Sequence, residues 1–358
     1  MTDNVTVKLF PALNNKIQGV NVMRSLRSLL MGVALVCAAA SSVSAQTPIT
    51  IGKITGGIGI HIPAYIAMDR GFFKEEGLDA RFIDLGGSAM IRAGLTNNLN
   101  FVPIPSGGAQ AILKAGAKIR YVVNQSLTSQ YVIVARPEYS KPDDLKGKII
   151  AFARPGAADY DEGVTVLARF FKMQVGKDYK VISLPGDPER IAALLNKDID
   201  AAFVSAPQGV RAVQAGMRLV MRAGDYLPRV GGGFWTTDEY FEKNPEAVKK
   251  FIRAIAKGVM YFRDHKAESL ATIKGHLGIS DDAQAGLIWD ELHNSFAAEM
   301  PADLYRELFE SRRLDMIVAK EWPADKPLPD PEQWLARTLL ESTLKDMGYV
   351  PTKIATPK

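Results

Sequence analysis

PAYIAMDRGFFKEEGLD, residues Pro63 to Asp79, predicts a short helix that stops at a glycine and leads directly into a strand. Pro63 suits the first helical turn, where a backbone N–H has no partner within the helix. Gly71 permits the left-handed conformation that ends many helices. We expect Phe72 and Phe73 to pack this helix end against a sheet, while the charged side chains that follow stay in solvent. A helix joined to a strand in this way is the repeating unit of an α/β fold.

The first 45 residues predict a cleaved signal peptide, and therefore a periplasmic or secreted protein. A basic segment, Met23 to Arg27, precedes the apolar run from Leu29 to Ala40, and small residues end the segment at Ala45. We expect translation to start at Met23 and cleavage to follow Ala45. The apolar run is shorter than the roughly twenty residues that span a bilayer, and no later uncharged segment reaches that length.

The composition of the remaining chain excludes several classes of function. Removal of residues 1–45 lowers the formal net charge from +5 to about +2, so the basic character is no evidence for nucleic-acid binding. Cys37 is the single cysteine and leaves with the signal peptide, so we expect neither disulfides nor thiol chemistry. Val36 before it argues against a lipoprotein signal, which requires a small residue there. The four histidines lie far apart without metal-ligand spacing, so we predict no metal and no cofactor.

Apolar runs alternate with helical patterns along the chain from Gln46, which predicts an α/β protein of two domains. We assign residues 46–135 and 236–358 to a first lobe and residues 136–235 to a second lobe. Tyr131 to Ala135 is the expected first crossing strand, and Phe234 to Thr236 the second. Gly231-Gly232-Gly233 is expected to be a flexible joint at that second crossing. The longest helix is expected from Pro245 to Asp264, with one apolar stripe.

Four motifs in order resemble a family of transport proteins. They are the AYIAMDRGFFKEEGL segment, RAGLTNNLN from Arg92, DDLKGK from Asp143 and LLNKDIDAA from Leu194. Together they resemble the periplasmic substrate-binding proteins of nitrate/sulfonate/taurine-type ABC transporters, the NitT/TauT or SsuA/THI5-like (NMT1-like) proteins. The resemblance implies a two-lobed periplasmic-binding-protein fold of type II, in which each lobe is a mostly parallel sheet flanked by helices and two strands cross between the lobes. It also implies a monomer that holds one small ligand between the lobes and delivers it to an ABC permease with its ATPase.

Loops between strands and helices supply the candidate ligand site, because ligands of open α/β sheets bind beyond the carboxyl ends of strands. Four such loops, at 55–61, 86–88, 105–108 and 154–158, are rich in small residues. Backbone N–H groups at the helix starts favour a carboxylate, sulfonate or phosphate, although serines there can also simply cap the helices. The candidate ligand-binding residues are Gly57, Gly59, His61, Tyr65, Gly87, Ser88, Ser106, Gly107, Gly156, Ala157, Tyr160 and Trp235.

The expected chemistry of these residues differs from that of the family in one place. His61 could donate to an anionic group, while Tyr160 and Trp235 could form aromatic walls or belong to the core. Many relatives hold the ligand's acid group with a Gly-Ser pair, where this chain has Gly156-Ala157. Three carboxylates follow at Asp159, Asp161 and Glu162, and Arg154 offsets only part of their charge. This departure argues against a plain sulfonate or nitrate and favours an aromatic, heterocyclic or amine-bearing ligand.

Three functions fit this sequence. The first is a non-enzymatic capture protein, the periplasmic component of an importer. The second is an enzyme on the same fold, either a hydrolase or a protein like the pyrimidine-precursor synthase, but the mature chain has no cysteine and Pro105-Ser106-Gly107 does not match the G-x-S-x-G motif. The third is a ligand-binding sensor partner, which would use the same cleft.

Overall fold

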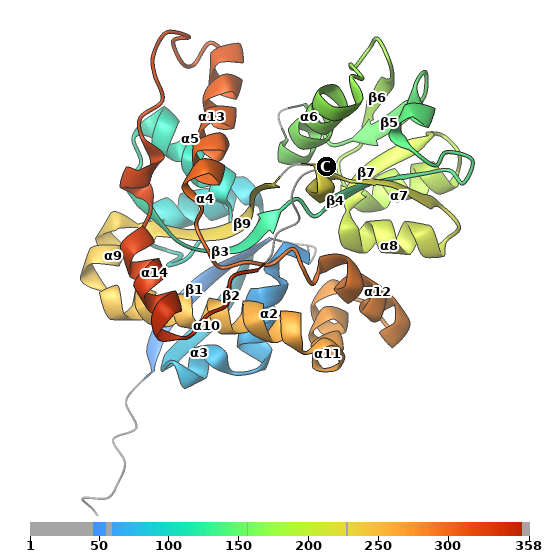
Figure 1. Cartoon of the computed structure of the whole chain (residues 1–358). Helices are drawn as coiled ribbons and strands as arrows, with labels where there is room; N and C mark the ends of the chain where they lie inside the picture. Colours follow the sequence, from blue (N-terminus) through green and yellow to red (C-terminus); the bar gives the residue numbers. More distant parts are fainter. Residues whose placement is uncertain (1–45, 55–58, 156, 227, 353–358) are drawn as a thin grey trace, which may run out of the picture. The chain divides into compact units, whose positions relative to one another are not determined.

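Two sets of strands organise the computed structural model, which describes residues 46–54, 59–155, 157–226 and 228–352 (Figure 1). The first lobe contains β1 (Thr47–Ile54), β2 (Leu78–Leu85), β3 (Ile119–Thr128) and β9 (Pro228–Thr237). The second lobe contains β4 (Tyr131–Ala135), β5 (Ile149–Phe152), β6 (Lys180–Ser183), β7 (Ala201–Ser205) and β8 (Arg218–Arg222). Residues 129–130 join β3 to β4, and the chain returns to the first lobe after η3, where β9 begins.

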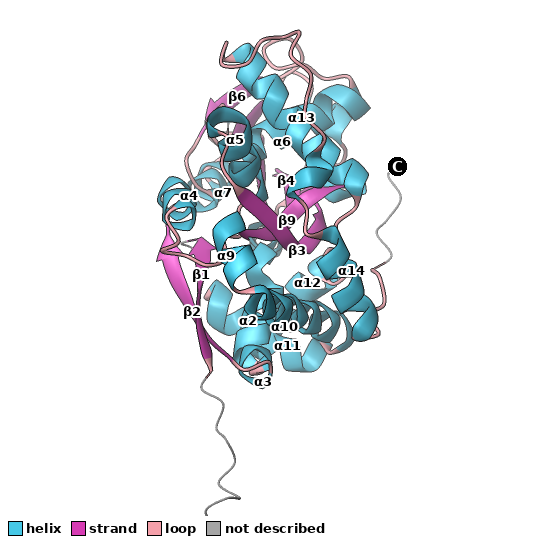
Figure 2. Ribbon diagram, turned by 90° about the vertical axis from the view of Figure 1, so that its left-hand side faces the viewer, coloured by secondary structure: helices cyan, strands magenta, loops and turns pink. Residues whose placement is uncertain are grey.

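Helices flank both sheets (Figure 2). In the first lobe they are α2 (Ile62–Asp69), α3 (Phe72–Glu75), α4 (Gly87–Leu95), α5 (Pro105–Ala115), α9 (Asp238–Lys243), α10 (Pro245–Asp264), α13 (Ala302–Val318) and α14 (Arg337–Asp346). In the second they are α6 (Ala158–Phe171), α7 (Asp187–Leu195) and α8 (Ala206–Gln214). Helices α11 (Lys266–Leu277) and α12 (Asp282–Leu292) follow α10 and pack against α2 and α8, respectively. Short 3-10 turns are η1 (Gly59–His61), η2 (Pro142–Leu145), η3 (Ala223–Asp225) and η4 (Pro331–Trp334).

The two sheets have the same order of strands. In the second lobe the order is β6-β5-β7-β4-β8, with β4 antiparallel to both of its neighbours. In the first lobe, Phe101 pairs with β1 in parallel and Val102 pairs with β9 in antiparallel fashion, which links β2-β1 to β9-β3. One antiparallel strand therefore interrupts each otherwise parallel sheet. In both lobes that strand belongs to the segment of chain that has just arrived from the other lobe.

The positions of β4 and β9 differ from the expected crossing strands. Tyr131 to Ala135 lies inside the sheet of the second lobe, where Val132 pairs with Val204, and the whole of β9 pairs with β3 in the first lobe. An apolar run predicts that a strand is buried, but it does not indicate which sheet buries it. The pairing favours lobe boundaries near residues 130 and 228 over the expected boundaries at 135 and 235.

The glycine triplet is part of strand β9 and forms no joint. A Cβ atom at Gly231 would collide with the carbonyl oxygen of Thr128, and one at Gly233 with the side chain of Asn124 on β3. At Gly232 it would lie 2.5 Å from Cγ1 of Ile60. Glycine is needed here because neighbouring chain segments approach the backbone closely, a role that differs from the expected flexibility.

The segment around Gly71 ends its helix as expected. Gly71 has a φ of +77° and separates α2 from α3. Phe73 is buried and lies 5.9 Å, between ring centroids, from Phe251 of α10. The aromatic residue after the glycine thus packs against a helix as well as beside the sheet.

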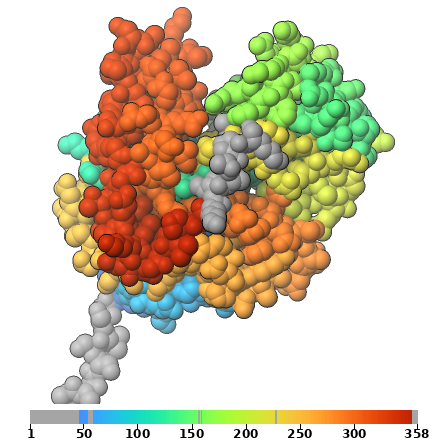
Figure 3. All heavy atoms as spheres, viewed as in Figure 1, coloured from blue at the N-terminus to red at the C-terminus, as the bar shows by residue number. Residues whose placement is uncertain are grey.

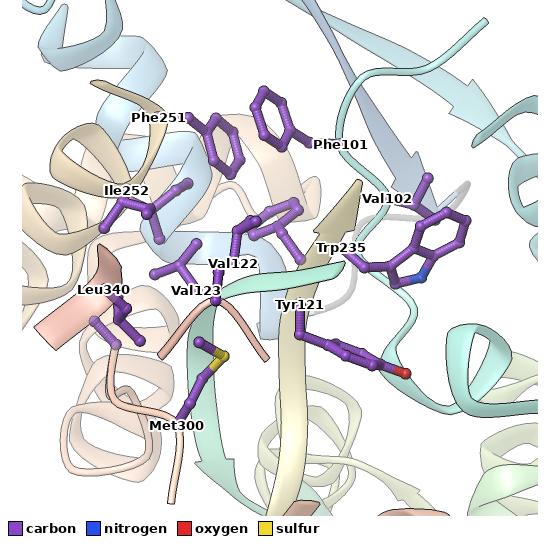
Figure 4. Close-up of a cluster of buried hydrophobic side chains, with 14 of the residues drawn as sticks. Phe101, Val102, Tyr121, Val122, Val123, Trp235, Phe251, Ile252, Met300 and Leu340 are labelled. Carbon is purple, nitrogen blue, oxygen red and sulfur yellow. The ribbon is translucent and has the colours of Figure 1, made fainter. Parts of the chain in front are cut away.

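Helix α10 carries the core of the first lobe. It spans Pro245–Asp264, as the sequence predicts, and its apolar stripe is buried. Phe251 stacks on Phe101 with ring centroids 3.6 Å apart, and Trp235 lies fully buried in the same cluster (Figure 4). Among the described residues, no helix is long and apolar enough to cross a membrane. Leu335, between η4 and α14, bridges to Tyr121 of β3 and separates these two elements.

Candidate ligand-binding cleft

A cavity of about 170 Å³ lies between the two lobes and touches the first crossing, at Ser129 and Gln130, and the start of β9, where the chain re-enters the first lobe. Figure 3 shows a notch between α13 and the second lobe on the face in view, but the residues that line this cavity include none from α13. The lining residues are Gly59, Ile60, Pro103, Ile104, Pro105, Ser106, Ser129, Gln130, Tyr131, Glu162, Ser205, Arg229, Val230 and Gly231. Because both lobes and both crossings contribute, any movement of one lobe against the other changes this cavity.

The topology of the sheets explains why these residues meet. Pro103 to Ser106 follow the short strand segment at Phe101 and open α5, while Ser205 ends β7 and precedes α8. Neither helix has a side-chain cap at its start. The N–H of Ala206 donates to the carbonyl of Gln130 at 2.8 Å. The first N–H groups of a helix have no intrahelical partners, so helix starts at a cavity are suited to an acceptor group of a ligand.

Several predicted residues of the first lobe lie at or near the cavity. Gly59 and Ser106 line it, and Gly107 is buried directly behind, where a Cβ atom would lie 3.1 Å from Cγ2 of Ile104. Gly87 and Ser88 are exposed at the start of α4. The position of a Cβ atom on Gly87 is 3.9 Å from Cδ1 of Ile104, so this helix start lies beside the cavity wall. Gly57 and Gly156 lie outside the described residues.

His61 and Tyr65 are buried behind the cavity instead of facing it. Nδ1 of His61 lies 3.3 Å from the amide nitrogen of Gln125, and the ring of Tyr65 stacks on His276 at 4.1 Å. Within the described residues, neither Nε2 of His61 nor the hydroxyl of Tyr65 has a hydrogen-bond partner. Burial, assisted by nearby Lys53, lowers the pKa of His61 to about 3. His61 is therefore a neutral imidazole at physiological pH, and any donation to an anion would come from a neutral N–H.

Trp235 is a core residue in this structure. Its side chain is 0% exposed, and its Nε1 donates to the carbonyl of Ile104 at 3.0 Å. The same carbonyl belongs to a residue that lines the cavity, so Trp235 supports the wall from behind. The structure therefore shows Trp235 packed in the core and not in an aromatic wall of the ligand site.

A second cavity, of about 630 Å³, adjoins the first within the second lobe and shares Tyr131 and Ser205 with it. Ala157 lines this cavity beside the exposed Arg154. Tyr160 is half-buried and packs edge-on against Phe152, with ring centroids 5.8 Å apart. The loops at the carboxyl ends of β5, β6 and β7 therefore line one cavity.

The three carboxylates at the start of α6 each have an arginine partner. Asp159 lies 3.0 Å from Arg190, Glu162 pairs with Arg229, and Asp161 lies 3.7 Å from Arg312. Arg190, Arg229 and Arg312 were missed as site residues because each is distant in sequence from its carboxylate. Three arginines other than Arg154 thus offset the charge of these carboxylates, which therefore oppose an anionic ligand less strongly than the sequence predicts.

Glu162 differs from the other carboxylates because its environment is incomplete. Its side chain is 2% exposed, and one oxygen, Oε2, pairs with Arg229. No described residue gives Oε1 a hydrogen bond of normal geometry, although the Ser129 hydroxyl lies close enough to favour the charged form. Burial outweighs Arg229 and raises the pKa of Glu162 above its usual range. No group of three or more potential metal ligands occurs in the part of the chain that the structure describes.

The common strand order, the two crossings and the cavity between the lobes define the two-lobed periplasmic-binding-protein fold of type II. The chain belongs to the NMT1/THI5 like family, whose model matches residues 59–269.

Individual relatives are distant. YtlA of Bacillus subtilis (strain 168) is 26% identical over 243 residues, which are 65% of this chain and 71% of YtlA. The periplasmic aliphatic sulphonate binding protein SsuA from Escherichia coli has a similar structure, with a TM-score of 0.66, 18% identity, and coverage of 82% of this chain and 99% of SsuA. The desulfurization enzyme DSZB also shares the fold, with a TM-score of 0.61, 14% identity, and coverage of 84% of this chain and 100% of DSZB. The fold alone therefore includes both binding proteins and an enzyme.

Proposed function

We propose that this protein is the periplasmic solute-binding component of an ABC importer, which captures a small organic ligand between its lobes and delivers it to a membrane permease. The cavity that both lobes and both crossings line is the observation that carries this proposal. Rotation of one lobe about the two crossings would enclose a ligand and present a different outer surface to a permease. The name of SsuA as an aliphatic sulphonate binding protein of the periplasm supports the same function.

The cavity suits a ligand that has both polar and apolar parts. Ile60, Ile104 and Val230 supply apolar walls, while Ser106, Ser129 and Ser205 supply hydroxyl groups. Small-molecule sites of this kind combine apolar walls with a few polar groups that orient the ligand. Sulfonates, carboxylates and aromatic or heterocyclic compounds form the range to be tested.

Binding without catalysis is the preferred function. The single cysteine, Cys37, precedes the expected cleavage site, whereas a cysteine-to-serine variant of DSZB was crystallised with biphenyl-2-sulfinic acid. Ser106 lines the cavity, but no described histidine hydrogen-bonds to it as a general base would. A sensor partner would use the same cavity and remains the alternative within the binding class.

A thermal-shift screen of residues 46–358 tests the capture function. The probes are sulfonates, nitrate, aromatic carboxylates, pyrimidines, flavins and polyamines. A ligand that binds only the folded state stabilises it by about 2.7 kcal/mol at a hundredfold excess over its Kd. We expect a saturable shift from one class and recovery of the ligand unchanged by mass spectrometry. Recovery of an altered ligand would support an enzyme instead, and the absence of any shift would contradict the proposed range of ligands.

Location and assembly need separate measurements. We expect the protein from a periplasmic fraction to begin at Gln46 by N-terminal sequencing, and light scattering to give the mass of a monomer. Cross-linking during transport tests whether its partner is a permease with an ATPase, and deletion of that permease distinguishes transport from sensing. A protein that starts at Met1 in the cytoplasm would contradict the periplasmic location.

A further inference from the structure

The incomplete partners of Glu162 indicate the chemistry of the ligand, and this step rests on the proposed function. Glu162 is 5% exposed as a residue and lines the cleft cavity. Arg229 holds one carboxylate oxygen, which fixes the carboxylate at the junction of α6 and the second crossing. A buried carboxylate oxygen has lost its water and gains most from an N–H or O–H donor.

Gln130 adds a second group without partners to the same cavity. Both the amide oxygen and the amide nitrogen of its side chain are buried, and neither has a partner among the described residues. Its Oε1 lies beside Gly59, 3.3 Å from the position that a Cβ atom would take there. The amide oxygen of Gln130 can accept hydrogen bonds and its amide nitrogen can donate them. Gln130 is therefore suited to a ligand that has a donor group next to an acceptor group.

The nearby carboxylates of the second lobe do not share this property. Asp187 accepts from the backbone N–H and the hydroxyl of Ser205 at 2.9 and 2.5 Å and also pairs with Arg190. Asp159 pairs with Arg190 at 3.0 Å. These carboxylates are used within the protein, whereas Glu162 lines the cavity and its buried Oε1 has no hydrogen bond of normal geometry to a described residue.

We infer that the ligand carries nitrogen-borne hydrogen-bond donors, as in an amidine, an amide or an amino-substituted heterocycle, and that Glu162 selects it by accepting one of these donors. Nitrate and alkanesulfonates have no donor at neutral pH and therefore cannot give Oε1 of Glu162 a hydrogen bond. The apolar walls formed by Ile60, Ile104 and Val230 leave space for a flat, compact ring beside this polar edge.

Matched probes test this inference on the chain from Gln46. Each pair differs in donor content: 4-aminopyrimidine against pyrimidine, and benzamidine against benzoate, with nitrate and ethanesulfonate as donor-free anions. Thermal shifts and calorimetric titrations are measured for the wild type, Glu162→Gln and Asp161→Asn. Asp161 is the matched control because the charge change is identical and the neighbouring side chain faces Arg312 of α13, outside the cleft cavity.

We expect a donor-bearing probe to bind the wild type and the Asp161→Asn variant alike, and to bind the Glu162→Gln variant about ten- to a hundredfold more weakly. The circular dichroism spectra and melting curves of the free variants establish that each one is folded. If donor-free anions bind and Glu162→Gln leaves their affinity unchanged, the inference is wrong and the capture function stands. Equal binding of the donor probes to the wild type and the Glu162→Gln variant would also overturn the inference. If no probe in either set binds, the inference is contradicted, while the wider thermal-shift screen tests the capture function separately.

Discussion

Arg190 and Glu162 are both buried charged residues of the second lobe, but their surroundings are very different. The guanidinium of Arg190 donates to the carbonyls of Leu184 and Phe203 and pairs with Asp159 and Asp187. Glu162 has one arginine partner, and its second oxygen has no hydrogen bond of normal geometry among the described residues, with only the Ser129 hydroxyl nearby. A buried charge with a complete set of partners holds the lobe together, whereas one with an incomplete set at a cavity is available to a ligand.

The largest expected effect is that of Arg190→Met. Removal of the guanidinium takes one partner from each of two carboxylates and two carbonyls, so we expect a loss of about 3–5 kcal/mol in the free energy of unfolding. Urea denaturation measures it. Arg154→Met is the matched control, because Arg154 lines the same second cavity but is exposed, and it is expected to change stability by less than about 0.5 kcal/mol. Similar losses in the two variants would remove the distinction between the two arginines.

A pH-dependent effect is expected from His61, a buried titratable group close to the cleft. Its folded pKa of about 3 lies below its unfolded value of 6.5, so its stabilising contribution is complete above pH 6.5 and is lost as the pH falls towards 3. Between pH 7 and pH 5 the wild type is expected to lose about 2 kcal/mol that His61→Gln does not lose. Denaturation of both proteins at several pH values measures the difference. If the stability of the wild type and that of His61→Gln change in parallel with pH, the pKa of His61 is not lowered in the folded protein.

The replacement Glu162→Gln is expected to be mild for the ligand-free protein and to have the opposite pH dependence. Because burial raises the pKa of Glu162, folding favours its protonated form. The stability that this protonation contributes is fully present when the pH is below the pKa of Glu162 in the unfolded chain. It is lost as the pH rises through the pKa of Glu162 in the folded protein. We therefore expect the stability of the Glu162→Gln variant, relative to that of the wild type, to increase as the pH rises. At pH 7 the variant is expected to be more stable by about 1 kcal/mol. A strong destabilisation like that of Arg190→Met would indicate that Glu162 also stabilises the fold.

The smallest effect concerns an exposed ion pair between the lobes. Arg169 of α6 and Glu307 of α13 lie 3.5 Å apart, with side chains 58% and 51% exposed. Solvent and salt screen such a pair, so Glu307→Gln is expected to cost less than about 0.5 kcal/mol, and nothing measurable in 1 M NaCl. Denaturation at low and high salt measures this cost. A larger cost that persists in high salt would mean that the pair is more strongly coupled than its exposure indicates.

Much of the fold could be predicted from local pattern. The limits of α10 and the stop at Gly71 agree with the structure, because a 3.6-residue apolar period and a left-handed glycine are properties of one short segment. The family assignment also came from short motifs in order, and the family model confirms it. For the candidate site, local pattern predicted that Gly59, Ser106 and Ala157 lie in loops at the carboxyl ends of strands.

Tertiary structure decided the remainder. It placed β4 in the second sheet, made Gly231 a point of close approach, and put Trp235 in the core and not on a cavity wall. It also brought Arg229 to Glu162, 67 positions away in the sequence. Composition and periodicity determine which segments become helices and strands and which of their faces avoid water. Which strands pair, and which buried charges find complete partners, depends on contacts between distant segments, and these exist only once the chain is folded.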